Sequence, residues 1–325
     1  GVWENLKKNL ININKIHTSQ ANTFGRTLLD AKDFNETALG YIISYGDLMK
    51  SLTKKVQSLS DVKIFYETKV SKCIDDRGLQ NLSVQTKNQS RDIKTKFVIL
   101  ADGANKKIKG IELNQTTKNL NHSAIVTKLT AELPHQNIAY ERFTPEGPIA
   151  LLPNKSNKFS LVWTGSCEYI DRLKEMNDKR FLSQLHKSFG DRVGNFESCE
   201  KRISFNLIQS RSEVFHSNIV ALGNASQTMH PVAGQGLNTG FKDAFELDKL
   251  LKKFIGKKNL GLILDDYKNS RSKQQKKILD FTELLVDGFL NDLIGLKNLR
   301  GYALTLLDIS KPMKKSFVRK LSYGE

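Results

Sequence analysis

Residues 219–254 have the types and spacing best suited to binding a cofactor. A short apolar run is followed by a turn of glycine and small polar residues and then by a long amphipathic pattern. This order predicts a strand that leads through a loop into the N-terminus of a helix. Because the first turn of a helix has unpaired backbone N–H groups and about half a positive charge, the junction suits an anion or an electron-rich ring edge.

Individual residues of the junction fit this role. Gly223 lets the backbone leave the apolar strand 219–222 sharply, and Pro231 fixes its own φ. Gly234 and Gly236 leave space beside the main chain for a flat or charged group. Spacing alone leaves an alternative open, in which the glycines of an ordinary strand-to-helix crossover serve only close packing.

Upstream of the junction, the pattern changes to short strands with alternating apolar and polar residues. Turns that contain Pro, Gly and Asn separate these strands, which predicts an antiparallel sheet. The four expected strands are residues 124–129, 138–143, 149–152 and 159–163.

The wording of the junction closely resembles a known cofactor motif. GNASQTMHPVAGQGLNTGFKDA, which begins at Gly223, is similar to the second flavin-contacting motif of class A flavoprotein monooxygenases, GDAAHxxxPxxGQGxNxGxxDA. Asn224 stands where most of that family has Asp. Together with Gln227 and the His230-Pro231 pair, this Asn resembles the variant found in the ubiquinone-biosynthesis branch of the family.

A second motif precedes the first. Residues 97–100 are another strand candidate, and they run directly into Asp102 and Gly103. Asp-Gly is a common turn dipeptide, but in this order it resembles the family's DG motif, which lies near the cofactor pyrophosphate and the nicotinamide approach. The family often continues with Ser and Arg, where this chain has Lys106 and Lys109. Because these two residues differ from the family pattern, the motif does not predict which residues contact NAD(P)H.

Two segments of the expected antiparallel sheet resemble the same branch. Residues 140–153 and 160–163 are similar to its ERFTxxGPxALLP and SLVW segments. In the family this sheet covers the aromatic substrate, so the resemblance implies substrate contacts for Phe143, Leu151 and Trp163. The alternative is that all three are ordinary core residues.

The resemblance implies an FAD-dependent enzyme that hydroxylates the aromatic ring of a polyprenylated phenol in ubiquinone biosynthesis. NAD(P)H would reduce FAD, O2 would give a C4a-hydroperoxide on the reduced ring, and one oxygen atom would pass to the phenol. A sister hydroxylase of the pathway, acting at another ring carbon, is the nearest alternative. The implied cofactor-binding residues are Asp102, Gly103, Gly223, Asn224, Pro231, Gly234, Gln235, Gly236, Leu237 and Asn238.

The roles of these residues follow from the same resemblance. Backbone donors of Gly236, Leu237 and Asn238 would stabilise negative charge at the N1/C2 edge of the reduced flavin. Asn224 would bind the ribityl or phosphate portion. A catalytic base is not assigned, because His230, the nearest candidate in sequence, can equally hold the turn. The histidines and the three cysteines lack metal-ligand spacing, so we expect no metal site.

The implied fold class is α/β. It is an FAD/NAD(P)-binding, Rossmann-like fold with an inserted antiparallel substrate sheet and a helical C-terminal region. Gly234-Gln235-Gly236 is the only Gly-x-Gly sequence, so we expect the first βαβ unit, with its glycine loop, to be missing by N-terminal truncation. The expected division is 1–115 partial FAD-binding domain, 116–210 substrate domain, 211–255 return segment of the FAD-binding domain and 256–325 C-terminal helices.

Net charge is +17 and lysine dominates over arginine. We expect surface solvation first, attraction to an anionic membrane second, and no nucleic-acid partner. No apolar run approaches the ~20 residues of a membrane-spanning helix, so we expect a cytoplasmic protein, with peripheral attachment to the inner membrane and contact with other ubiquinone-biosynthesis proteins as further options. A non-catalytic, basic module that binds membrane or partner proteins is the alternative from another class.

An apolar stripe near the C-terminus bears on that alternative. A basic cluster follows it, which would suit a bilayer surface, whereas helical stripes more often close a core. The stripe comprises Leu285, Phe289, Leu293, Leu296, Leu299, Ala303 and Leu306, and the cluster Lys311, Lys314, Lys315, Arg319 and Lys320.

Overall fold

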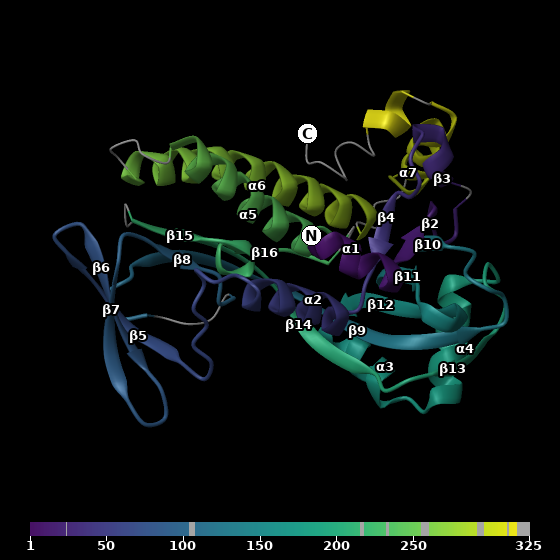
Figure 1. Cartoon of the computed structure of the whole chain (residues 1–325). Helices are drawn as coiled ribbons and strands as arrows, with labels where there is room; N and C mark the ends of the chain where they lie inside the picture. Colours follow the sequence, from purple (N-terminus) through teal and green to yellow (C-terminus); the bar gives the residue numbers. More distant parts are fainter. Residues whose placement is uncertain are drawn as a thin grey trace.

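The computed structural model describes the backbone of residues 1–23, 25–103, 108–214, 218–231, 234–254, 260–290, 296–310 and 312–316. Figure 1 shows α3 (Cys167–Glu175) and α4 (Asp178–Phe189) against one side of a large sheet. Two long helices, α5 (Gln235–Phe254) and α6 (Leu260–Leu290), lie side by side. The last helix, α7 (Leu296–Ile309), packs beside strand β3.

A nine-stranded sheet is the centre of the fold. Neighbouring strands follow the order β16-β14-β9-β12-β11-β10-β2-β3, and β13 pairs with β9. Every pair is antiparallel except β10 with β2, which is parallel. The strands are β2 (Lys15–Gln20), β3 (Arg26–Asp30), β9 (Leu113–Ala131), β10 (Ile138–Thr144), β11 (Gly147–Pro153), β12 (Lys158–Ser166), β13 (Phe196–Cys199), β14 (Ile203–Val214) and β16 (Gln227–Thr228).

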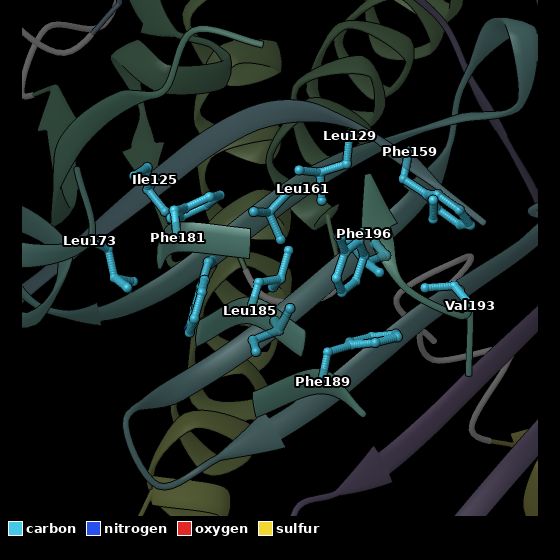
Figure 2. Close-up of a cluster of buried hydrophobic side chains, with 14 of the residues drawn as sticks. Ile125, Leu129, Phe159, Leu161, Leu173, Phe181, Leu185, Phe189, Val193 and Phe196 are labelled. Atoms are coloured by element: carbon cyan, nitrogen blue, oxygen red, sulfur yellow. The ribbon is translucent and has the colours of Figure 1, made fainter. Parts of the chain in front are cut away.

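One face of this sheet packs on α3 and α4. Because strand side chains alternate between faces, every second residue of β9, β11 and β12 points into this core. Side-chain caps fix the start of each helix: Ser166 Oγ accepts the amide of Tyr169, and Asn177 Oδ1 accepts that of Arg180. The core, shown in part in Figure 2, includes Ile125, Leu129, Ile149, Leu151, Phe159, Leu161, Trp163, Ile170, Leu173, Phe181, Leu185 and Phe189.

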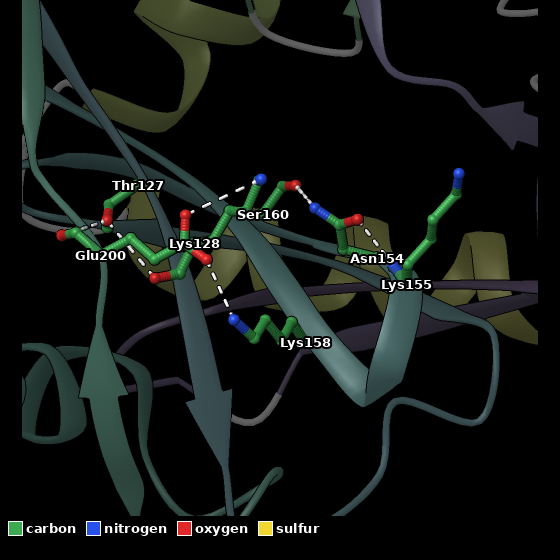
Figure 3. A network of polar contacts seen from close by, with 7 residues as sticks. All are labelled: Thr127, Lys128, Asn154, Lys155, Lys158, Ser160 and Glu200. Carbon is green, nitrogen blue, oxygen red and sulfur yellow. Dashed lines mark hydrogen bonds and ion pairs between the residues drawn. The ribbon is translucent and has the colours of Figure 1, made fainter. Parts of the chain in front are cut away.

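Polar contacts fasten one end of the sheet (Figure 3). Glu200 follows β13, and its carboxylate lies 3.0 Å from Lys158 Nζ, while its carbonyl oxygen accepts Thr127 Oγ1 at 2.8 Å. Across the turn before β12, Asn154 Nδ2 donates to Ser160 Oγ at 2.8 Å. These contacts join β9, β12 and β13 where the ladder ends.

A small parallel sheet lies apart from the large one. It consists of β8 (Val98–Leu100) and β15 (Ile219–Ala221), and its apolar residues pack under α5 and α6 through Leu247, Leu264 and Tyr267. The remaining elements are α1 (Val2–Leu6), β1 (Ile11–Ile13), β4 (Gly40–Ile42), α2 (Tyr45–Gln57) and the antiparallel meander β5 (Lys69–Asp76), β6 (Leu79–Gln85) and β7 (Ser90–Thr95).

Helix α7 covers the edge strand β3. Asp308 Oδ1 accepts the amide of Leu28 at 2.9 Å, and Lys314 Nζ donates to the Leu28 carbonyl at the same distance. Gly25 and Gly301 approach so closely that a Cβ on Gly25 would overlap the Gly301 backbone. The backbone groups of the edge strand are thus capped by side chains of the C-terminal segment.

The expected fold class is confirmed. The four expected strands correspond to β9, β10, β11 and β12, and the helix after the junction is α5. Strands β2 and β3, from the segment expected to be FAD-binding, pair in the large sheet, and the domain boundaries stay a prediction.

Of the predicted apolar stripe near the C-terminus, the structure describes only the side chain of Leu306. Four lysine and arginine residues named above lie outside the described residues: Lys106, Lys311, Arg319 and Lys320.

Candidate functional site

Two parallel strands bring the two predicted cofactor motifs together. Val98 pairs with Ile219 and Leu100 with Ala221, and the amide of Leu222 donates to the Leu100 carbonyl at 2.8 Å. The chain segments that leave the two strands therefore start side by side at one sheet edge. Asp102 and Gly103 follow the first strand, and Gly223 and Asn224 follow the second. Ligands of parallel sheets bind outside this carboxyl edge.

Gly223 makes the sharp turn after β15. Its φ is +56°, in the region that favours glycine, and a Cβ there would lie 3.8 Å from Gly240 Cα in α5. The amides of Ala225 and Ser226 bond back to the Leu222 and Gly223 carbonyls at 3.2 and 2.9 Å. Asn224 is exposed, so it is the side chain of this turn that can face a ligand.

The turn is anchored by a buried ion pair that the sequence analysis missed. Asp243 Oδ2 accepts the Gly223 amide at 2.9 Å, while Asp243 Oδ1 accepts Arg271 Nε at 2.7 Å and lies 2.5 Å from Arg271 Nη2. Asp243 is 0% exposed and Arg271 1%. The sequence signal was present in the final Asp-Ala of the motif and in the arginine of the tail. Helix α6 thus holds the turn through α5.

A second contact from α6 holds the same turn. Gln275 Nε2 donates to Ser226 Oγ at 3.0 Å, and both side chains are buried. One helical turn earlier, Ser272 Oγ accepts Arg211 Nη2 at 2.5 Å from β14. These bonds join the turn, the large sheet and α6 into one polar network.

The N-terminus of α5 is open. Gly234 has φ +61°, and a Cβ on Gly234 or Gly236 would meet no atom within 4 Å among the described residues beyond its chain neighbours and its own helical turn. Leu237 is 55% exposed and Asn238 is exposed as well. The first amides of α5 have no acceptor within the helix, so this end provides donors beside open space. Residues 232–233 lie outside the described part.

His230 and Pro231 lie just before this helix end. His230 is 4% exposed, and burial, assisted by the charge of His122, lowers its pKa to about 4. It is therefore neutral at physiological pH. The influence of His122 also shows that the loop lies near β9, and the alternation of β9 puts His122 on the same sheet face as Ala124 and Val126.

The three predicted substrate residues fall on different faces of the sheet. Leu151 and Trp163 are fully buried in the core with α3 and α4. Phe143 is also buried, at 3%, but its register puts it on the opposite face, beside Pro148. The packing favours a core role for Leu151 and Trp163, whereas Phe143 stays a predicted residue of the ligand face.

The residues fit the ring end of a flavin. A Gly-lined helix terminus supplies donors without side chains in the way, and two parallel strands end beside it. Asp102 is exposed and Gly103 is partly exposed. By contrast, the backbone of Lys109 is hydrogen-bonded to the backbone of Ser71 and Cys73 in β5. Among the residues described, no cluster of three His, Cys, Asp or Glu could hold a metal ion.

Two ubiquinone-pathway hydroxylases are similar in sequence to this chain. UbiL of Rhodospirillum rubrum, a ubiquinone hydroxylase, is 29% identical over 253 residues that cover 75% of this chain and 58% of UbiL. The mitochondrial ubiquinone biosynthesis monooxygenase COQ6 of Homo sapiens is 27% identical over 326 residues that cover 86% of this chain and 69% of COQ6. The chain thus spans little more than half of UbiL.

The fold is shared with a solved structure. The p-nitrophenol 4-monooxygenase PnpA from Pseudomonas putida DLL-E4 matches with a TM-score of 0.76 and 13% sequence identity, over 98% of this chain and 83% of PnpA. The family described as "FAD binding domain" matches residues 1–282. Since this match covers most of the sequence, the chain belongs to the FAD-binding domain family.

Proposed function

We propose that the chain has the activity of an FAD-dependent monooxygenase that hydroxylates the aromatic ring of a polyprenylated phenol in ubiquinone biosynthesis, with NAD(P)H and O2. The names of UbiL and COQ6 support the pathway and the reaction class. The observation on which the proposal rests is the open N-terminus of α5 beside the paired ends of β8 and β15.

When bound, FAD supplies electron transfer from NAD(P)H and activation of O2. The chain's own residues supply position and charge. Backbone N–H groups of Gly236, Leu237 and Asn238 would face the electron-rich ring edge, where a helix N-terminus stabilises negative charge. Asn224 would bind the polar chain of the cofactor, and Pro231 would shape the pocket wall. Asp102 and Gly103 would lie on the pyrophosphate and nicotinamide side.

Flavin binding tests this proposal directly. FAD is titrated into the purified chain, and quenching of its fluorescence reports occupancy. We expect weak but saturable binding, because the sequence has no glycine loop for the pyrophosphate. Binding that is abolished by a mutation at the α5 terminus supports the assignment. A chain that quenches no flavin at any concentration contradicts it.

The position of hydroxylation separates the two pathway alternatives. The ubiquinone-pathway hydroxylase that the motifs resemble and its sister enzyme add oxygen at different ring carbons. Turnover of a prenylated phenol followed by NMR of the product identifies the carbon. Hydroxylation at the sister position would replace the first alternative while leaving the reaction class intact.

A second role, attachment to an anionic membrane surface, is favoured by one observation. Three exposed apolar residues recur at helical spacing on α7: Tyr302, Leu306 and Ile309 are 64, 56 and 75% exposed. Met313, beyond the end of the helix, is 44% exposed. Exposed Lys315 follows this row, as expected of an interfacial helix. None of the described helices combines the length and apolar character that crossing a bilayer requires. A peripheral location would bring the site near a lipid-soluble substrate.

Vesicle binding tests this second role. We expect the chain to float with vesicles that contain phosphatidylglycerol, and the double variant Leu306→Ser, Ile309→Ser to float less. Ile203→Ser, at a 56% exposed position on β14, is the control. Equal flotation of the double variant and the control would rule out this surface. Flotation without any flavin binding would favour the non-catalytic module.

A further inference from the structure

A band of partly exposed side chains crosses the sheet face that α3 and α4 leave uncovered. Cross-strand partners define it as one row: Thr18 on β2, Glu141 on β10, Ala150 on β11, Val162 on β12 and Val126 on β9. All five are partly exposed.

The neighbouring row on the other face is different. Leu151 and Leu161, one residue along from Ala150 and Val162, are 0 and 1% exposed. A packed sheet face has no accessible surface in its middle strands. The band therefore has accessible surface in the middle strands of the sheet, with β1 packed beside β11 and α6 beside β10.

Glu141 is the ionisable residue of the band. Its partners on the neighbouring strands, Thr18 and Ala150, have small side chains. The carboxyl group of Glu141 is therefore flanked by small and largely apolar side chains. Among the side chains that the structure describes, no cation or hydrogen-bond donor is paired with it. Burial raises the pKa of Glu141 to about 7.

The band faces the candidate cofactor loop. His122, which influences His230 electrostatically, lies on the same face of β9 as Val126. The loop before α5 therefore lies over the sheet face that bears Glu141. Phe143 is on this face too, two residues along β10. An aromatic ring on the band would therefore lie on the same sheet face as the loop that holds the predicted flavin edge.

We propose that Glu141 accepts the proton of the substrate's aromatic hydroxyl group. The O–H bond of the phenol breaks, the proton binds a carboxylate oxygen of Glu141, and the electron pair stays on the phenol oxygen. The negative oxygen enriches the ring carbons in electrons, which favours attack on an electrophilic oxygen. This inference rests on the proposed hydroxylase function, and it assigns Glu141 as the catalytic base that the motifs left unassigned.

The neighbouring histidines are poorer candidates. Burial lowers the pKa values of His230 and His122, which makes both weak bases. A phenol with an ordinary pKa of about 10 loses its proton to a carboxylate of pKa about 7 with an equilibrium penalty of roughly 10³-fold, against more than 10⁵-fold for an ordinary Glu. A base closer in pKa to its substrate is more effective.

The test uses a phenol whose colour reports its proton. 3-Nitrophenol is bound to the full chain at pH 7.5, with and without FAD, and its absorption is recorded. We expect the hydrogen bond from the phenol to the Glu141 carboxylate to shift the absorption of the wild-type complex part of the way towards the phenolate spectrum. The shift should be lost in Glu141→Gln and partly recovered in Glu141→Asp. Glu197→Gln removes an exposed carboxylate from β13 and serves as the control.

Turnover gives the second measurement. With FAD and NAD(P)H, Glu141→Gln should lower kcat by roughly 10²-fold or more while flavin quenching stays unchanged. A variant that keeps the red shift and the wild-type kcat overturns the assignment of Glu141, as does a wild-type chain that gives no red shift. Failure of the wild-type chain to bind FAD counts against the hydroxylase function, and the flavin-free spectra still decide the role of Glu141.

Discussion

The amide of Gly223 donates to Asp243 Oδ2 at 2.9 Å, although the two residues are 20 positions apart in the sequence. The same carboxylate is paired with Arg271 of α6 in a fully buried contact. The turn that presents Asn224 is therefore oriented by α6, a helix that carries none of the predicted cofactor-binding residues. The ion pair is a positioning element for the site.

Replacement of Asp243 should destabilise the chain strongly. Asp243→Asn leaves the buried guanidinium of Arg271 without a counter-charge, and breaking such a pair costs about 3–5 kcal/mol. Urea unfolding measures the loss. The double variant Asp243→Leu, Arg271→Met removes both charges and should recover part of it, although the Gly223 amide stays unpaired. A single variant within about 1 kcal/mol of wild type would contradict this role.

Gly236→Val should prevent flavin binding without unfolding the chain. A Cβ on Gly236 meets no described atom within 4 Å outside its own helical turn, so the new side chain would occupy the space where the ring edge would approach. Gly46→Val is a matched control, because Gly46 is likewise the second residue of its helix and has open surroundings. FAD fluorescence quenching and melting temperature are compared. Equal FAD binding by the two variants would place the flavin elsewhere.

His230 should make stability depend on pH. Its folded-state pKa of about 4 lies below the unfolded value of 6.5, so the unfolded chain takes up the proton first as pH falls from 6.5 to 4, and stability decreases through that window. The contribution lost between pH 7.5 and pH 5 is about 2 kcal/mol. His230→Gln should remove that part.

The comparison must be made between variants because other groups titrate in the same range. His17 also has a pKa of about 4 and acts in the same direction, whereas the raised pKa of Glu141 acts in the opposite direction, with stability lost as pH rises towards 7. Urea midpoints of wild type and His230→Gln at both pH values isolate the histidine. If stability depended on pH equally in the two proteins, folding would leave the pKa of His230 unchanged, which would contradict this prediction.

Gly25→Ala should loosen the docking of α7. The added methyl group overlaps the backbone of Gly301, and overpacking of this kind costs about 1–3 kcal/mol. Gly46→Ala, in open surroundings within α2, should be neutral or slightly stabilising. Melting temperature and proteolysis near residue 296 report the change. Unaltered protection of α7 would mean that the contact is not tight.

The sequence predicted local elements and the family well. The strand, turn and helix at residues 219–254 appear as β15, the Gly223 turn and α5, because their apolar spacing and their glycines act locally. The family match to residues 1–282 confirms the resemblance inferred from the motifs. The contacts of individual site residues with FAD and substrate stay predictions.

Contacts between residues far apart in the chain could not be predicted from the sequence. Both faces of β10 and β11 carry apolar residues, Phe143 and Ala150 on one and Leu151 on the other, so the alternation did not separate Phe143 from Leu151. The pairing of β2 with β10 joins residues more than one hundred positions apart and follows no local signal. Arg271 and Asp243 meet only when α6 packs on α5.

The covering of β3 by α7 has a consequence for biosynthesis. The carboxylate and ammonium groups that cap the backbone of Leu28 belong to Asp308 and Lys314, which are translated 280 and 286 residues later. At roughly 5–20 residues per second, a ribosome needs on the order of 14–56 s to reach them. During that interval the backbone N–H and C=O groups on the outer side of β3 have no partner and can pair with a strand of another chain. Chaperone binding and translation speed should therefore affect the yield of native protein.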